Sequence, residues 1–217
     1  MKNEEDETPT PGSAAMTWWA GLAFNRGARA RLRRSASVAD VQLSEPFVRL
    51  LRETRAGGQD HASAGFPNED AVAAAAIVIA RLPGAVEDEK DEGEGASKPR
   101  SFRINSAKKL FEALAAPRGK ASADDDVSPP RGGSPVFSRL RFTRLLRTPS
   151  DDPDAIVQGF SRAIESLKPK PHDISPAAVF DVVAGWGRDD VRRRAAYAYW
   201  SRIIDTETPT NSKGKAK

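Results

Sequence analysis

Apolar residues recur along the chain at three- and four-residue spacing, and no stretch sustains the alternation that is typical of a β-strand. The first such stretch has its apolar positions at i, i+3, i+4 and i+7: Ala15, Trp18, Trp19 and Leu22. This spacing places all four on one face of a helix. We expect Ser13 to cap this helix and Gly27 to end it.

The same periodicity continues to the end of the chain, and cap residues mark most of the predicted helix starts. Asn68 precedes an apolar run, and Ser175 precedes Pro176, which is favoured at the first position of a helix. The further helices are expected over residues 45–56, 69–82, 108–116, 138–147, 153–167, 176–186 and 189–205. Inward positions include Phe47, Leu50, Phe111, Phe142, Phe160, Val179, Trp186 and Tyr199. The fold class is therefore predicted to be all-α.

Two stretches between the helices are too polar or too rich in Gly and Pro to support a packed core. Residues 84–100 are acidic, and residues 117–134 contain Ser, Pro, Gly and three consecutive Asp residues. We interpret the second stretch as an interdomain linker. The predicted organisation is two small helical bundles joined by a flexible linker, with these bounds: a disordered tail at 1–12, an N-terminal helical domain at 13–116 with the acidic loop 84–100, the linker at 117–134, a C-terminal bundle at 135–206 and a disordered tail at 207–217.

Composition changes this picture by adding a strong positive charge. The 217 residues carry a net charge of +4, and two acidic segments, residues 1–7 and 87–95, conceal how basic the predicted helices are. A field of this sign favours polyanions, although charge alone does not separate nucleic acid from anionic lipid.

Other features exclude several classes of function. The chain has no Cys, so it has neither disulfides nor thiolate metal sites, and His61 and His172 lie far apart. The longest apolar run, residues 71–80, is about half of the ~20 residues that a membrane span needs. No nucleophile, base or metal ligands have a credible spacing. We expect a cytoplasmic protein that is not an enzyme and has no cofactor or metal.

Arginine clusters occur in both halves of the chain. Residues 27–34 read GARARLRR, and residues 138–147 place Arg141, Arg144 and Arg147 at three-residue spacing opposite an apolar face. Arginine grips phosphate in bidentate fashion, so contact with a nucleic-acid backbone, independent of sequence, is favoured over membrane binding. For any single arginine, a solvated position or a structural ion pair competes equally with a phosphate contact.

In their order along the chain, these motifs resemble the CasB family, the small subunits of the type I-E CRISPR Cascade complex. The resemblance rests on Trp18 or Trp19, Leu22, GARARLRR, PFVRLL (46–51), SRLRFTRLLRT (138–148) and the pair of C-terminal helices with Trp186 and Trp200. It covers most of residues 16–204. The acidic N-terminal tail, the acidic loop and the long linker depart from the family pattern.

The resemblance implies a non-catalytic, two-domain helical subunit that binds the guide RNA, the target DNA and the displaced strand. Its implied partners are the backbone and large Cascade subunits and a second copy of itself, arranged head to tail. Arg34, Arg141, Arg147 and Arg162 fall on family arginines; helical geometry alone adds Arg29, Arg33, Arg144 and Arg193. The alternative is a helical adaptor that docks acidic protein partners without nucleic acid.

Overall fold

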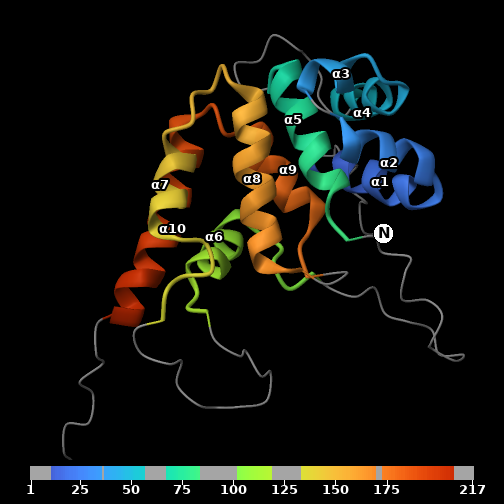
Figure 1. Ribbon diagram of the computed structural model, residues 1–217. Coiled ribbons are helices and arrows are strands. Elements are labelled where there is room, and N and C mark those ends of the chain that lie inside the picture. The colour runs from blue at the N-terminus through green and yellow to red at the C-terminus, as the bar shows by residue number, and fades with distance from the viewer. Residues whose placement is uncertain are drawn as a thin grey trace, which may run out of the picture.

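A computed structural model gives the positions of residues 11–35, 37–56, 67–83, 102–118, 133–169 and 173–207. Every regular element within these ranges is an α-helix, which confirms the predicted fold class (Figure 1). The helices before residue 84 are α1 (Pro11–Phe24), α2 (Arg26–Arg34), α3 (Val38–Gln42), α4 (Glu45–Ala56) and α5 (Glu69–Ala80). Those after residue 101 are α6 (Ala107–Ala115), α7 (Arg139–Leu146), α8 (Pro153–Leu167), α9 (Pro176–Ala184) and α10 (Asp189–Glu207).

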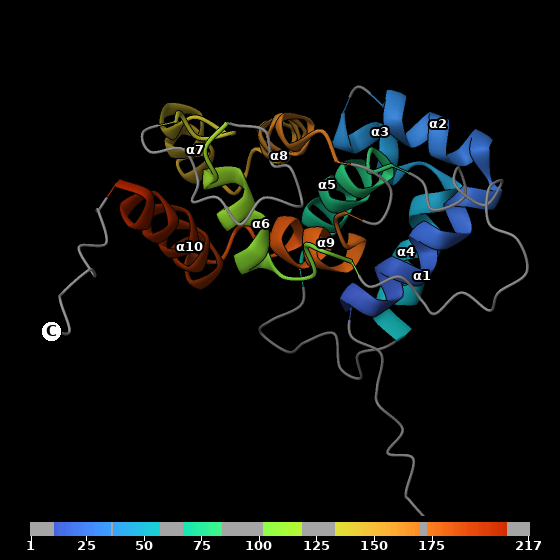
Figure 2. The same ribbon diagram turned by 90° about the horizontal axis from the view of Figure 1, so that it is seen from below.

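Helix α5 is the central element of the fold. Its residues 72–80 are all buried and consist only of Ala, Val and Ile. Small side chains on every face allow neighbours to approach closely all round, and α5 contacts α1 to α4 as well as α8 and α9 (Figures 1 and 2). The Asn68 side chain begins this helix as predicted, because its Oδ1 accepts a hydrogen bond from the backbone N–H of Ala71 at 2.8 Å.

The predicted boundaries of the first helix are wrong at both ends. Helix α1 begins at Pro11, so Ser13 lies inside its first turn and does not cap it. The helical conformation is interrupted at Asn25. Its side chain accepts a hydrogen bond from the N–H of Ala28 at 3.0 Å and so caps the start of α2. Gly27 therefore lies in the first turn of α2 and does not end α1. The side-chain cap at Asn25 determines where the second helix starts.

Aromatic residues form the part of the core that lies among the later helices. Trp186 is fully buried, with its ring 4.8 Å from that of Phe160 in an edge-on arrangement and 6.1 Å from that of Phe111. The Phe142 ring stacks on Tyr199 at a centroid distance of 3.8 Å. These contacts connect α6 with the helices after residue 133.

The structure does not confirm two separate bundles joined by a linker. Buried residues from both halves of the chain form one contiguous hydrophobic cluster, and α6, assigned to the N-terminal domain, packs on α8, α9 and α10. The two ends of the predicted linker are also paired, since the Arg118 N–H donates to Ser134 O and the Val136 N–H donates to Ala116 O, both at 2.8 Å. Most of residues 117–134, the whole acidic loop 84–100 and nearly all of both predicted tails lie outside the described residues. Pro11 and Gly12, predicted to belong to the N-terminal tail, form the start of α1, and Glu207 ends α10.

Tyr199 makes the stability of this core depend on pH. It is buried, its hydroxyl donates to Phe137 O at 2.5 Å, and burial raises its pKa to about 12 although Arg139 nearby lowers it. Because the unfolded chain releases this proton near pH 10 while the folded protein retains it, stability is expected to fall as pH rises from 10 to 12.

Tyr199→Phe tests this dependence. The variant is expected to lose about 1 kcal/mol of unfolding free energy at pH 7 through the missing hydrogen bond. Its disadvantage relative to the wild type should shrink between pH 10 and 12, as measured by urea unfolding at each pH. A constant difference across this range would contradict the assigned pKa shift.

Candidate nucleic-acid interface

Helix α7 has one apolar face and one basic face. The Ser138 side chain caps it, accepting from the Arg141 N–H at 3.5 Å. Phe142 and Leu145 are buried, whereas Arg141 and Arg144 are exposed. The predicted amphipathic helix is confirmed, and its arginines point away from the core.

Helix α8 lies beside α7 and approaches it closely at Gly159. A methyl group at Gly159 would lie 2.6 Å from Leu145 Cδ1, so a side chain at this position would force Leu145 to shift. One turn further along α8, Arg162 is exposed. The close contact brings Arg162 and the two arginines of α7 to the same crevice.

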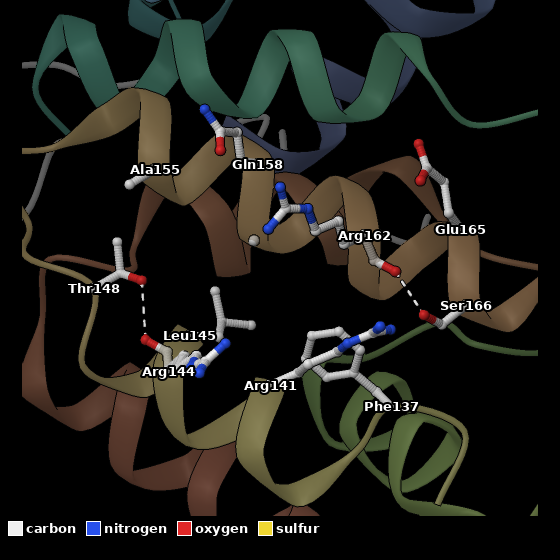
Figure 3. A pocket seen from close by; sticks show the side chains of 11 residues that line it. Phe137, Arg141, Arg144, Leu145, Thr148, Ala155, Gln158, Arg162, Glu165 and Ser166 are labelled. Atoms are coloured by element: carbon white, nitrogen blue, oxygen red, sulfur yellow. Dashed lines mark hydrogen bonds between the residues drawn. The ribbon is translucent and has the colours of Figure 1, made fainter.

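This crevice, which we call the α7–α8 groove, has a volume of about 700 Å³. Arg141 and Arg144 line it from one side and Arg162 from the other, with Leu145 between the helices (Figure 3). The Thr148 hydroxyl donates to Arg144 O at 3.2 Å, and the Ser166 hydroxyl donates to Arg162 O at 2.7 Å. The remaining lining residues are Phe137, Ala155, Gln158, Gly159 and Glu165.

The three groove arginines gather in one place without the acidic partners that several other arginines have. In the part of the chain that the structure describes, no carboxylate pairs with Arg141, Arg144 or Arg162, and Glu165 is the one acidic residue in the groove lining. Some arginines elsewhere are instead paired with a carboxylate, as in Arg49–Glu53 at 3.0 Å and Arg55–Glu69 at 2.5 Å. The groove therefore presents positive charge that is available to an anion.

Helix α2 adds exposed arginines on the same side of the molecule. Ala28 and Leu32 are buried where α2 packs on α5 and α1, whereas Arg33 and Arg34 are exposed in its last turn. Figure 2 shows α7, α8, α3 and α2 along one side, with α10, α9 and α1 toward the other. The helices that carry two groups of predicted site residues thus lie along the same side of the molecule.

Arg29 has a different environment from the other predicted site residues. It is half-buried, its Nε donates to Ala80 O at 3.3 Å, and its Nη2 donates to Leu82 O. A cation at these carbonyls satisfies the otherwise unpaired C-terminal end of α5 and complements the helix dipole. We therefore assign Arg29 a role in attaching α2 to α5.

Arg29→Ala should consequently affect stability and not nucleic-acid binding. Loss of hydrogen bonds from a charged donor is expected to cost about 1–3 kcal/mol of unfolding free energy, as measured by chemical denaturation. Arg33→Ala, in the same helix but exposed, should cost less than about 0.5 kcal/mol. Equal stability of the two variants would contradict this assignment.

The remaining predicted arginines lie outside the groove. Arg147 is exposed at the C-terminal end of α7, one turn beyond Arg144. Arg193 is exposed on α10, where its neighbours Arg192 and Arg194 pair with Asp189 and Asp190. The structure therefore brings together only Arg141, Arg144 and Arg162 in one site.

Sequence reasoning overlooked the polar residues that share the groove with these arginines. Gln158 is exposed on α8 four residues before Arg162, and Thr148 follows Arg144 at the same spacing, just beyond the C-terminal end of α7. Extending the four-residue spacing from each arginine would have found both. The pairing of the two helices, however, is not visible in either motif.

The described residues form neither a metal-binding cluster nor a membrane-spanning helix. No group of three or more His, Cys, Asp or Glu residues there is arranged to hold a metal ion. Asp124 to Asp126, His61 and His172 lie outside this part of the chain. None of the helices described has the combination of length and apolarity that crossing a membrane requires.

Together, the fold and the site define an all-helical protein with a basic face that carries a groove lined by arginines. Comparison with models of protein families matches residues 28–200 to the CRISPR-associated protein Cse2 family. The chain belongs to this family, the CasB small subunits of type I-E Cascade, as its ordered motifs predicted. No curated protein and no solved structure matched the chain.

Proposed function

We propose that this protein is a non-catalytic small subunit of a type I-E Cascade complex and that it holds nucleic acid through its basic face. The observation that carries the proposal is the convergence of Arg141, Arg144 and Arg162 on one groove without acidic partners among the described residues. Guanidinium groups form paired hydrogen bonds with phosphate oxygens, and these contacts do not depend on base identity.

Backbone contacts of this kind have a direct effect on target binding. Exchange of a DNA duplex for an RNA–DNA heteroduplex is nearly balanced in free energy, so additional contacts with the displaced strand or the heteroduplex determine how long the open state persists. The groove arginines and Arg34 supply such contacts along one face. The protein thereby stabilises the target-bound R-loop during cytoplasmic antiviral defence.

Protein partners are proposed to cover apolar residues at the N-terminal helices. Phe24 and Leu43 are 86% and 90% exposed, on α1 and at the end of α3. Large side chains of this kind favour burial in an interface over contact with water. The expected neighbours are the backbone and large Cascade subunits and a second copy of this chain.

Co-purification distinguishes this function from that of an adaptor for acidic proteins. The tagged full-length chain, expressed with the other Cascade proteins and a guide RNA, should recover both the subunits and the guide. The adaptor alternative predicts the recovery of acidic proteins without RNA, even when nuclease is omitted. That second result would exclude the proposed function.

A further inference from the structure

Helix α10 exposes a row of residues that the groove does not explain. Arg193, Tyr197, Trp200 and Ile204 follow one another at spacings of four, three and four residues, which places them on one helical face. Tyr197 is 70% and Ile204 58% exposed, whereas Trp200 is half-buried. We call this face the α10 stripe.

Arg193 is one of three consecutive arginines and differs from its two neighbours in having no acidic partner in the described part of the chain. Arg192 has its Nη2 3.9 Å from Asp189 Oδ1 and also donates to Gly187 O at 3.1 Å. Arg194 has its Nη2 2.6 Å from Asp190 Oδ2. Arg193 forms no ion pair with any residue that the structure describes, and helical spacing puts it on the same face as Tyr197.

The α10 stripe is connected to the α7–α8 groove through α7. The Phe142 ring lies 5.9 Å from that of Trp200 in an edge-on arrangement and stacks on Tyr199. Helix α7 therefore lies between the groove and α10, and Figure 1 shows it directly in front of α10. A strand that leaves the groove reaches the α10 stripe by crossing α7, where Arg144 and Arg147 are exposed.

The charge around the α10 stripe favours an anionic ligand with flat, apolar parts. Asp189, Asp190 and Glu207 on α10 are each paired with an arginine, respectively Arg192, Arg194 and Arg139. Asp205, about three turns beyond Arg193, is the acidic residue of α10 without an arginine partner among the described residues. A free guanidinium beside an exposed aromatic ring is the combination that binds single-stranded nucleic acid, since bases stack on the ring while the cation contacts phosphate.

We propose that Tyr197 is a stacking platform for an unpaired base of a single strand and that Arg193 holds the adjacent phosphate. This inference rests on the proposed function, because the strand must first be held by the basic face. It adds a requirement for exposed bases, which phosphate contacts in the groove do not impose. A duplex, whose bases are already stacked, gains nothing from Tyr197.

Two oligonucleotides with equal numbers of phosphates test the stacking contact. Binding of the full-length chain to a fluorescent oligothymidylate, and to an abasic strand of the same length, is measured by anisotropy. Tyr197→Ala is expected to weaken oligothymidylate binding at least about fivefold, the lower end of the range for one stacked base, and to leave abasic binding unchanged. Tyr197→Phe, which retains the ring, should bind both strands as the wild type does.

Ile204→Ala is the matched control, because it removes an exposed apolar side chain from the same stripe without removing a ring. Its binding to both strands should equal that of the wild type, and thermal unfolding should show that all three variants remain folded. Equal oligothymidylate binding by Tyr197→Ala and the wild type would overturn the stacking contact and leave the proposed function standing. Failure of the wild type to bind either strand would instead remove the proposed function.

A protein interface on the α10 stripe predicts a different result. Tyr197→Ala and Ile204→Ala would then both reduce recovery of Cascade subunits in co-purification, with oligothymidylate binding unaffected. This outcome would overturn the stacking platform in favour of protein docking.

Discussion

Replacing Arg141, Arg144 and Arg162 together by Gln is expected to weaken single-stranded DNA binding by about 100-fold at 0.1 M salt. Each phosphate contact contributes about 0.7 to the dependence of log K on log salt for a single strand, and this electrostatic contribution vanishes near 1 M salt. Three lost contacts therefore remove about two decades of affinity at 0.1 M. The measurement is fluorescence anisotropy with a labelled oligothymidylate.

A variant with the same change in net charge provides the control. Arg49, Arg55 and Arg103 are surface arginines that pair with Glu53, Glu69 and Asp173, so their guanidinium groups are already occupied. Their triple replacement by Gln should change affinity less than about threefold, which reflects the general field alone. If both triple variants weaken binding equally, net charge and not the groove holds the strand.

Trp186→Ala is expected to lower the free energy of unfolding by about 3–5 kcal/mol. The ring is fully buried between Phe111 of α6 and Phe160 of α8, and its N–H has no hydrogen-bond partner among the described residues, so it acts through packing alone. A vacated site of this size cannot be refilled by the surrounding helices. Chemical denaturation followed by circular dichroism measures the loss.

The same experiment tests whether the helices form one core. Because buried residues from both halves form one cluster, wild type and variant should each unfold in a single transition. Tyr197→Ala, which removes an exposed ring, should change stability by less than about 0.5 kcal/mol. Two transitions, of which Trp186→Ala shifts only one, would restore the two-bundle organisation that the sequence predicted.

Local sequence signals predicted the helices well, because caps and apolar spacing act over a few residues. Asn68 and Ser175 were expected to precede a helix, and each accepts a hydrogen bond from a backbone N–H in the first turn of that helix. Ser138, the first residue of another predicted helix, does the same. The arginine spacing on α7 likewise placed Arg141 and Arg144 on its exposed face. Family membership followed from the order of these motifs.

Contacts between distant helices could not be predicted in this way. Nothing near Arg29 indicates that its guanidinium reaches carbonyls more than fifty residues away, at Ala80 and Leu82. Helices α7 and α8 approach closely at Gly159, which in the sequence is only a weak position inside a helix. The predicted division into two bundles is not confirmed for a similar reason: composition marks residues 117–134 as irregular but does not reveal that their ends pair.

The salt dependence of single-stranded DNA binding tests the central claim most directly, because its slope reports how many phosphate contacts the protein makes. Oligothymidylate affinity is measured between about 0.05 and 0.3 M salt for the wild type, the groove variant and the control triple variant. The slope of log K against log salt should be shallower by about 2 for the groove variant and unchanged for the control. An unchanged slope for the groove variant, in which Gln replaces Arg141, Arg144 and Arg162, would contradict the claim that these arginines hold the phosphates of the strand.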